Sequence, residues 1–253
     1  MNHNQEIRYS RNISLREIGI NGQEKLLRAK VLVIGAGGIG SPALLYLTAA
    51  GIGEIGIVDN DKVDLSNLQR QILHEAIDIN VEKTESAEAA LLDLNPDIKI
   101  NCHQLKIEED NAAKIIADYD IVLDGCDNFE TRFIVSDVCH KLKKPLISAS
   151  IEGWSGQMSA YKPYLEGDYP CYRCVYDSSL SRDDMPKCSE SGVLGAAAGV
   201  MGSIAATEII KEIVDVGDSM VGYMLVFDAF SMDMRKVKIA RDKNCSCVGK
   251  SKF

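Results

Sequence analysis

The chain has 253 residues, of which 46% are hydrophobic and 26% charged, the balance of an ordinary globular protein. Its net charge of −9 disfavours a nucleic-acid partner, because phosphate backbones attract basic surfaces. The polar start, MNHNQEIRYSRN, is unlike a secretory signal, and no apolar run reaches the roughly 18 residues of a membrane span. We therefore expect a cytoplasmic protein with no membrane partner, whose eight cysteines are reduced thiols, bind metal or include a catalytic thiol.

In chain order, residues 1–12 are predicted to form a polar arm, and residues 14–29 short helices broken at Gly19 and Gly22. A buried strand over 30–34 leads into the glycine turn GAGGIG and a helix that ends at Gly51. Further strands (54–59, 98–105, 120–128, 145–150) alternate with helices (83–96, 109–119, 129–142). This alternation predicts an α/β fold with a doubly wound, mostly parallel sheet.

After residue 150 the pattern changes. Residues 153–163 are typical of a strand pair, 170–192 of a long loop with three cysteines, and 192–214 of a helix of small residues. Late strands over 224–230 and 234–241 complete an antiparallel C-terminal extension. With no repeat and no low-complexity linker, we predict one domain over 1–253, built from segments 1–29, 30–150 and 151–253.

The turn GAGGIG, residues 35–40, has the pattern G-x-G-x-x-G of a nucleotide site. Its glycines let the backbone approach phosphates, and the N-terminus of the next helix favours negative charge. Asp59 ends the following strand about twenty residues later, where a carboxylate can accept a hydrogen bond from a ribose hydroxyl. These features fit NAD as well as ATP, and a glycine-rich turn without a ligand is the third interpretation.

The next loop, DLSNLQRQ, favours ATP over NAD because it places Asn67, Gln69 and Arg70 close together. An enzyme that cleaves ATP must neutralise departing pyrophosphate, and Arg70 and Lys83 supply cations for this. Either residue, taken alone, is more readily interpreted as a solvated surface charge. Asp127 ends the third buried strand, predicted over 120–128, where a carboxylate can hold Mg²⁺.

Taken together, the chain resembles the MoeB/ThiF/HesA family, bacterial relatives of ubiquitin-activating enzymes. The resemblance runs from about Arg8 to Cys247 and is carried by RYSRN, GAGGIGSP, IVDNDKVDLSNLQRQ, KTESA, DGCDNFETR, PCYRC and CSESGVLG in that order. It implies a Rossmann-like fold and a homodimer that uses ATP to adenylate the C-terminal Gly-Gly carboxylate of a small ubiquitin-like sulfur carrier. Residues 30–150 would then be the nucleotide-binding half, and 151–253 the carrier-binding and zinc-knuckle half.

The adenylated carrier would be ready for thiocarboxylate formation, as in thiamin or molybdopterin biosynthesis. No rhodanese-like domain follows residue 253, so we expect a separate sulfur donor such as a cysteine desulfurase. The carrier carboxylate attacks the α-phosphorus of ATP and pyrophosphate leaves. No general base is required, because the carboxylate is already ionised at neutral pH.

The resemblance also assigns residues one by one. The positions that match the family's ATP and Mg²⁺ residues are Gly38, Asp59, Asn67, Gln69, Arg70, Lys83, Asp127 and Asn128, and we add Ser66 from the same loop. Arg11 matches an arginine that reaches the nucleotide from the partner subunit. Asn12 stands where glutamine or histidine is usual.

Two cysteine pairs form a candidate zinc site. Cys171 and Cys174 are a C-x-x-C pair, and Cys245 and Cys247 a C-x-C pair about seventy residues later. Four thiolates suit structural Zn²⁺, although the tighter second pair makes tetrahedral ligation harder than the family's C-x-x-C. Four ordinary reduced thiols are the alternative.

Cys188 differs from the other cysteines because it follows Lys187 in a polar loop, and a neighbouring cation lowers the pKa of a thiol. It matches a family cysteine that carries acyl or persulfide sulfur in ThiF-like members and is dispensable in MoeB-like ones. The remaining cysteines, Cys102, Cys126 and Cys139, are expected in the core. The histidines are expected to be structural.

Three alternatives to carrier adenylation stay open. An NAD(P)-dependent oxidoreductase would use the same glycine turn, although the C-terminal half has no evident proton-transfer His or Tyr. A non-catalytic nucleotide-binding scaffold would present the zinc knuckle. Finally, the adenylated carboxylate would belong to a peptide or a small molecule instead of a carrier protein.

Overall fold

The computed structural model describes residues 1–176 and 192–245. Its strands are β1 (Lys30–Ile34), β2 (Glu54–Val58), β3 (Lys99–His103), β4 (Ile121–Asp124), β5 (Leu146–Glu152), β6 (Ser155–Tyr161), β7 (Tyr223–Asp228) and β8 (Asp233–Lys238). Its α-helices are α1 (His3–Arg8), α2 (Ser10–Ile13), α3 (Gly19–Arg28), α4 (Gly40–Ala50), α5 (Lys83–Leu94), α6 (Ala112–Ala117), α7 (Phe129–Leu142) and α9 (Gly195–Val214). Short 3₁₀ turns are η1 (Leu65–Asn67), η2 (Ala76–Asp78) and η3 (Tyr172–Cys174).

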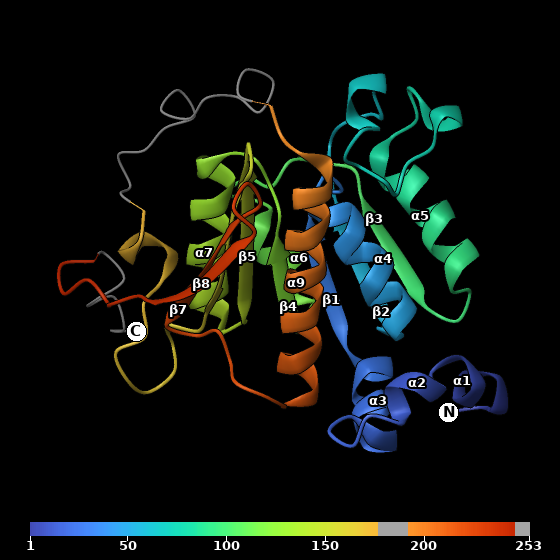
Figure 1. Cartoon of the computed structure of the whole chain (residues 1–253), viewed down its shortest axis with the longest axis horizontal. Helices are drawn as coiled ribbons and strands as arrows, with labels where there is room; N and C mark the ends of the chain where they lie inside the picture. The colour runs from blue at the N-terminus through green and yellow to red at the C-terminus, as the bar shows by residue number, and fades with distance from the viewer. Residues whose placement is uncertain (177–191, 246–253) are drawn as a thin grey trace.

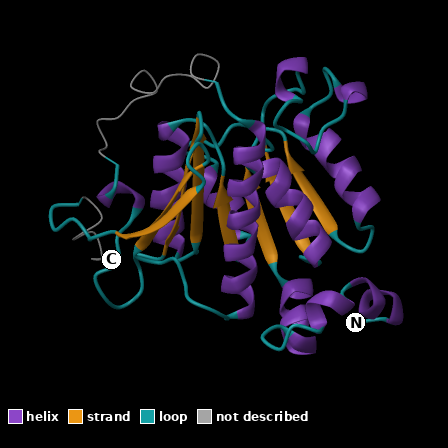
Figure 2. Cartoon of the chain, in the orientation of Figure 1, coloured by secondary structure: helices purple, strands orange, loops and turns teal. Residues whose placement is uncertain are grey.

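These strands form one eight-stranded sheet in the order β3-β2-β1-β4-β5-β6-β7-β8 (Figures 1 and 2). The five neighbouring strands β3-β2-β1-β4-β5 are parallel, and each of the pairs β5-β6, β6-β7 and β7-β8 is antiparallel. The predicted α/β fold, mostly parallel with an antiparallel C-terminal extension, is therefore confirmed.

Helices cover both faces of the parallel part, as a doubly wound sheet requires. The sheet's first face packs against α4, α5 and α9, and its second face against α6 and α7 (Figure 1). Strand β1 shows why: Val31 and Val33 belong to the first core, whereas Leu32 and Ile34 belong to the second. Successive side chains of a strand point to opposite faces of the sheet. A strand that is buried on both faces therefore has a continuous run of apolar residues.

The glycine turn after β1 depends on two of its glycines. Gly35 has a φ of +92°, in the left-handed region that favours glycine. A Cβ on Gly40 would lie 1.8 Å from the carbonyl oxygen of Gly35, so only glycine lets α4 start this close to the strand. The turn is therefore built for a tight strand-to-helix connection.

The N-terminal residues are more ordered than the sequence suggested. The predicted polar arm, residues 1–12, consists largely of α1 and the start of α2, and neither helix has a buried residue. Asn2 caps α1 by accepting from the backbone N–H of Gln5 (2.9 Å), and the Gln5 side chain accepts in return from the backbone N–H of Asn2 (3.0 Å). The predicted break at Gly19 coincides with the start of α3, but the predicted break at Gly22 was wrong, because α3 runs through it.

None of the described helices is both long enough and apolar enough to span a bilayer.

The expectation that Cys102 lies in the core was wrong. It lies on β3, the edge strand of the parallel side, and its side chain is exposed. Cys139 is buried, as predicted, and Cys126 is half-buried.

Candidate nucleotide site and cysteine cluster

The candidate nucleotide site lies at the carboxyl edge of the parallel strands, where the chain leaves β1, β2 and β4 (Figure 1). The Gly35 N–H donates to the carbonyl of Val58 (2.8 Å), and the Gly125 N–H donates to the carbonyl of Ile34 (3.0 Å). The glycine turn is thus held between the other two strand ends. Strand β1 is the point where the connections reverse direction across the sheet, which is where such folds bind ligands.

Asp59 ties the end of β2 to the glycine turn. Its carboxylate accepts hydrogen bonds from the backbone N–H groups of Ala36 (2.8 Å) and Asp61 (2.9 Å). Burial raises the pKa of this carboxyl, and the nearby Lys83 and the two N–H groups partly offset that rise. Asp59, the residue predicted to bind the ribose, therefore lies beside the glycine turn.

Arg70 reaches the same turn from the loop after β2. A Cβ on Gly38 would lie 3.4 Å from Arg70 Cγ and 3.3 Å from the Cβ of Ala198 in α9. The guanidinium Nη1 donates to the carbonyl of Ser66 (3.0 Å). Gly38 and Arg70, which were both predicted to bind ATP, therefore lie in contact.

The loop that carries Arg70 is braced by its own side chains. The carboxylate of Asp64 accepts from the backbone N–H (2.8 Å) and the hydroxyl (2.5 Å) of Ser66. The side-chain oxygen of Asn67 accepts from the Asp64 N–H (3.2 Å). Gln69 is exposed, and its carbonyl oxygen lies 2.3 Å from where a Cβ on Gly195 would be, so the loop touches the start of α9.

Lys83, the first residue of α5, is not a solvated surface charge, since its side chain is only 6% exposed. Its ammonium group lies 2.9 Å from the carboxylate of Asp61, which is 63% exposed. The Lys83 N–H also donates to the Asp61 carbonyl (2.9 Å). A buried cation with one exposed partner can exchange that partner for a phosphate.

His74 belongs to this site, although the sequence indicated only a structural role. Its Nε2 lies 3.1 Å from the carbonyl oxygen of Ala36, and its Nδ1 lies 2.8 Å from the hydroxyl of Ser86. A carbonyl oxygen only accepts, so Nε2 carries a proton. Burial lowers the pKa of the ring. Ala36 is therefore held by Asp59 at its N–H and by His74 at its carbonyl.

Asp127 and Asn128 follow β4 and precede α7. The side-chain oxygen of Asn128 caps α7 by accepting from the backbone N–H of Thr131 (2.9 Å), whereas Asp127 is exposed. The carbonyl of Gly125 lies 3.2 Å from where a Cβ on Gly35 would be, so this loop adjoins the glycine turn. An exposed carboxylate in this place is a donor of the kind that Mg²⁺ prefers.

Two further charged residues were missed by the sequence analysis. Asp124, the last residue of β4, is fully buried, and the guanidinium of Arg132 in α7 lies 3.6 Å from its carboxylate. The thiol of Cys126 donates to Asp124 (2.8 Å), and burial raises the pKa of this thiol far above its usual range. A raised pKa disfavours the thiolate, which is the nucleophilic form of a cysteine.

The remaining predicted residues lie elsewhere. Arg11 is exposed on α2, and the N-terminal helices lie beyond the amino ends of the strands, away from the glycine turn (Figure 1). Within one chain, Arg11 is not brought to this site. Cys188 and Cys247 lie outside the described residues.

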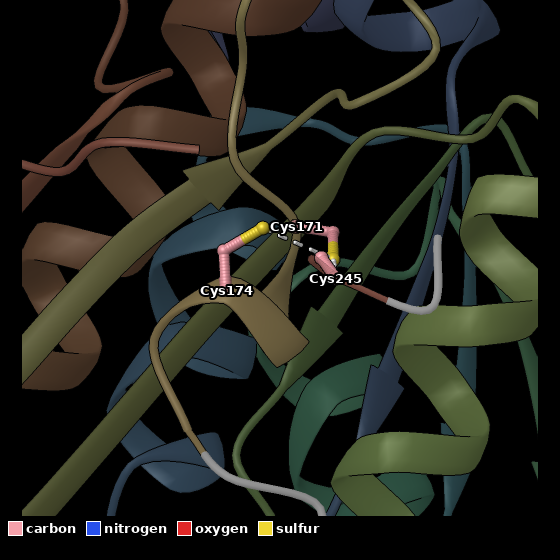
Figure 3. Close-up of side chains that lie close together, drawn as sticks. All are labelled: Cys171, Cys174 and Cys245. Carbon is pink, nitrogen blue, oxygen red and sulfur yellow. Dashed lines mark hydrogen bonds between the residues drawn. The ribbon is translucent and has the colours of Figure 1, made fainter. Parts of the chain in front are cut away.

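The described cysteines of the predicted zinc site do come together (Figure 3). The sulfur of Cys171 lies 3.7 Å from that of Cys174 and 3.4 Å from that of Cys245, and all three lie within 4.8 Å of one another. Sulfurs that share one tetrahedral ion with bonds of about 2.3 Å would be nearly 4 Å apart. The group is thus suited to hold a metal ion.

Comparison with known proteins places this architecture in a class. The ThiF family model matches residues 9–248, and the chain belongs to this family. It is 44% identical over 248 residues to the adenylyltransferase and sulfurtransferase MOCS3 of Culex quinquefasciatus, covering 98% of this chain and 56% of that protein. It is 43% identical over 247 residues to MOCS3 of Drosophila virilis, covering 98% of this chain and 54% of that protein. The chain therefore spans about half the length of these relatives.

Solved structures agree with this assignment. Crystalline Escherichia coli MccB with ATP superposes with a TM-score of 0.83 at 27% sequence identity, covering 96% of this chain and 74% of the other. The MccB structure with MccA-N7isoAsn gives a TM-score of 0.82 with the same identity, covering 96% of this chain and 75% of the other.

Proposed function

We propose that this chain is an adenylyltransferase that activates the C-terminal Gly-Gly carboxylate of a ubiquitin-like sulfur carrier. The observation that carries the proposal is the charge arrangement around the glycine turn. Arg70 packs against Gly38, and a buried Lys83 stands close enough to Asp59 to influence its titration. Fixed cations beside a phosphate-binding turn are what cleavage of ATP to AMP and pyrophosphate requires.

In the proposed reaction, a carboxylate oxygen of the carrier attacks the α-phosphorus of ATP. The bond between the α-phosphorus and the bridging oxygen breaks, and pyrophosphate leaves with its electron pair. Asp59 accepts a hydrogen bond from a ribose hydroxyl. Ser66, Asn67 and Gln69 also bind the nucleotide, while Arg70 and Lys83 offset the phosphate charge. Asp127, with Asn128 beside it, would hold Mg²⁺, which neutralises phosphate oxygens when bound.

The site is completed by a second copy of the chain in this proposal. Arg11 lies away from the glycine turn of its own chain, so its role at the nucleotide needs a homodimer. The two MOCS3 relatives support the general activity, because their names join adenylyl transfer with sulfur transfer.

After adenylation, the carbonyl carbon of the acyl-adenylate is open to attack by sulfur, with AMP as the leaving group. The terminal sulfur of a persulfide on a separate cytoplasmic protein such as a cysteine desulfurase attacks this carbon and forms an acyl disulfide. A second thiol then attacks the inner sulfur of that S–S bond, so the carrier leaves as a thiocarboxylate and the two thiols are joined as a disulfide. Cys188 is proposed as the residue that carries acyl or persulfide sulfur during this step, by its resemblance to the ThiF-like cysteine.

We further propose that Cys171, Cys174, Cys245 and Cys247 hold a structural Zn²⁺. The three described sulfurs have the mutual spacing of ligands to one ion. Because η3 carries Cys174 and Cys245 comes after β8, such an ion would fasten the end of the sheet to the loop that precedes α9.

The test is ATP–pyrophosphate exchange with a panel of ubiquitin-like proteins that end in Gly-Gly, taken from the same genome. Exchange should require one of these carriers and should stop when its final Gly-Gly is deleted. Exchange that occurs with small carboxylates or peptides instead would assign a different substrate. No exchange with any carboxylate, together with tight binding of NADH, would overturn the proposal in favour of an oxidoreductase.

A further inference from the structure

A buried charged network lies directly beneath the loop that carries Asp127. Asp124 has no exposed surface and Arg132 is 7% exposed, and their charged groups lie 3.6 Å apart. Asp124 ends β4, and Arg132 lies in the first turn of α7, so the pair spans the loop between them.

The network bonds to both sides of the Cys126 backbone. The carboxylate of Asp124 accepts from the N–H of Cys126 (3.1 Å), and the guanidinium of Arg132 donates to the carbonyl of Cys126. Cys126 immediately precedes Asp127, and Asn128 on the other side is fixed by its cap bond to Thr131 (2.9 Å). The backbone is therefore held immediately before and immediately after Asp127.

Strand β5 anchors the network from below. Arg132 donates to the hydroxyl of Ser148 (3.2 Å) and to the carbonyl of Ala149 (3.0 Å). The Ser148 hydroxyl in turn donates to the carboxylate of Asp124 (2.9 Å). A planar guanidinium can meet three such acceptors at once, which the single ammonium of lysine at this place cannot match.

Fold stability alone is a weak reason for such a network. Removing two charges from water is costly, and apolar residues of similar volume often serve a core as well as a buried ion pair. The network does, however, fix the position of the 125–128 loop. This loop lies beside the glycine turn, because the carbonyl of Gly125 approaches Gly35 closely.

We propose that Arg132, together with Asp124, is a positioning residue that fixes the 125–128 loop so that the Asp127 carboxylate is presented to the Mg²⁺ of bound MgATP. This inference rests on the proposed function of Asp127 as the magnesium ligand. Arg132 touches neither nucleotide nor metal in this arrangement and acts only through the loop.

The experiment is a Mg²⁺ titration of the binding of α,β-methylene-ATP to the full chain, with Arg132→Lys compared with the unchanged protein. The substitution keeps a positive charge beside Asp124 but loses the simultaneous bonds to Cys126, Ser148 and Ala149. The Mg²⁺ concentration at half effect should rise about tenfold, as for other residues that orient a metal ligand. Affinity for the analogue in EDTA should be unchanged, because the glycine turn is untouched.

Two companion variants separate positioning from stability. Ser148→Ala removes two bonds of the network, one from Arg132 and one to Asp124, while leaving both charges paired. It should raise the half-effect Mg²⁺ concentration by a smaller factor than Arg132→Lys. Glu208→Gln is the matched control, since Glu208 is also buried and charged but lies on α9, accepting from the Met220 N–H (2.7 Å). It should lower the melting temperature without moving the Mg²⁺ titration.

The variant Asp127→Asn separates the assignment of Asp127 as the magnesium ligand from the positioning role of Arg132. If Asp127→Asn shifts the Mg²⁺ titration but Arg132→Lys and Ser148→Ala only lower the melting temperature, the network is structural and the positioning role is overturned. If Asp127→Asn itself leaves the titration unmoved, the magnesium assignment fails, and the inference fails with it. If Arg132→Lys does not fold, Ser148→Ala decides the question by the same criterion.

Discussion

The ammonium group of Lys83 lies 2.9 Å from the carboxylate of Asp61, yet the lysine side chain is 6% exposed and the aspartate side chain 63%. A backbone hydrogen bond also links the two residues, because the Lys83 N–H donates to the Asp61 carbonyl. The cation is therefore fixed in position before any nucleotide arrives, while its partner stays free to turn into solvent. Such preorganisation is what favours stabilisation of developing phosphate charge.

Replacing this cation should affect catalysis more than folding. Lys83→Met is expected to lower the rate of ATP–pyrophosphate exchange by about 10²–10³, the effect of losing one preorganised charge in an active site. The matched control is Lys62→Met, because Lys62 is 62% exposed and pairs with Glu82 at 3.2 Å on the surface nearby. Lys62→Met should leave the exchange rate unchanged; equal losses in both variants would show that Lys83 has no special role.

The partner carboxylate gives the opposite expectation. Asp61→Asn should free Lys83 for phosphate and tighten ATP binding, by no more than about fivefold, because the carboxylate of Asp61 is mostly in solvent and such an ion pair is worth at most ~1 kcal/mol. Isothermal titration with ATP and with AMP checks this, and the gain should be larger for ATP. Weaker ATP binding in this variant would mean that Asp61 holds Lys83 in place and does not compete with the nucleotide.

The nucleotide motifs could be predicted because they are local. The apolar run of β1, the glycine turn and the strand-ending Asp59 are each read from a few neighbouring residues. Pairings such as Lys83 with Asp61 or Arg132 with Asp124 could not be, because nothing in the sequence shows whether a helix cation turns inward. His74 was missed for the same reason, since its partner Ala36 lies 38 residues earlier.

Other errors have equally physical causes. The short helices at the N-terminus carried a readable capping signal, Asn2 followed by Gln5, which the polarity of the segment concealed. Cys102 was predicted to lie in the core because of its apolar sequence context, but β3 is an edge strand and Cys102 is exposed there.

The cysteine cluster predicts a dependence of stability on zinc. The purified protein should contain one Zn²⁺ per chain by elemental analysis, and Cys171→Ser should lower the unfolding free energy by ~3 kcal/mol or more, about 6–12 °C in melting temperature. Cys102→Ser is the control, because that exposed thiol lies outside the cluster. A metal-free protein whose melting temperature is unaffected by Cys171→Ser would contradict the zinc proposal.

His74 predicts how stability changes with pH. Burial lowers its pKa in the folded chain, so below about pH 6.5 the unfolded chain binds more protons and the folded state loses stability as the pH falls. The stabilising contribution is fully present above that pH. Urea unfolding of the protein and of His74→Gln at pH 5 to 8 checks this, and the variant should show a shallower loss at low pH.

His103 and His140 also have pKa values lowered by burial, so the variant's slope should shrink without vanishing. A loss of stability in the variant that is as steep as, or steeper than, that of the unchanged protein would show that folding does not lower the pKa of His74, so that its ring becomes protonated in the folded chain at low pH. In that case its Nδ1 would donate to Ser86, and the Ser86 hydroxyl would donate to Asp78, where it already lies 2.7 Å from the carboxylate.

The most direct measurement follows an oxygen atom from the carrier to the nucleotide. A Gly-Gly carrier labelled with ¹⁸O in its C-terminal carboxylate is incubated with the protein, ATP and Mg²⁺, and hydroxylamine is added to trap the activated carbonyl. If the carboxylate attacks the α-phosphorus, mass spectrometry should find one ¹⁸O in AMP for each hydroxamate formed. Unlabelled AMP, or label found in orthophosphate beside ADP, would contradict formation of an acyl-adenylate.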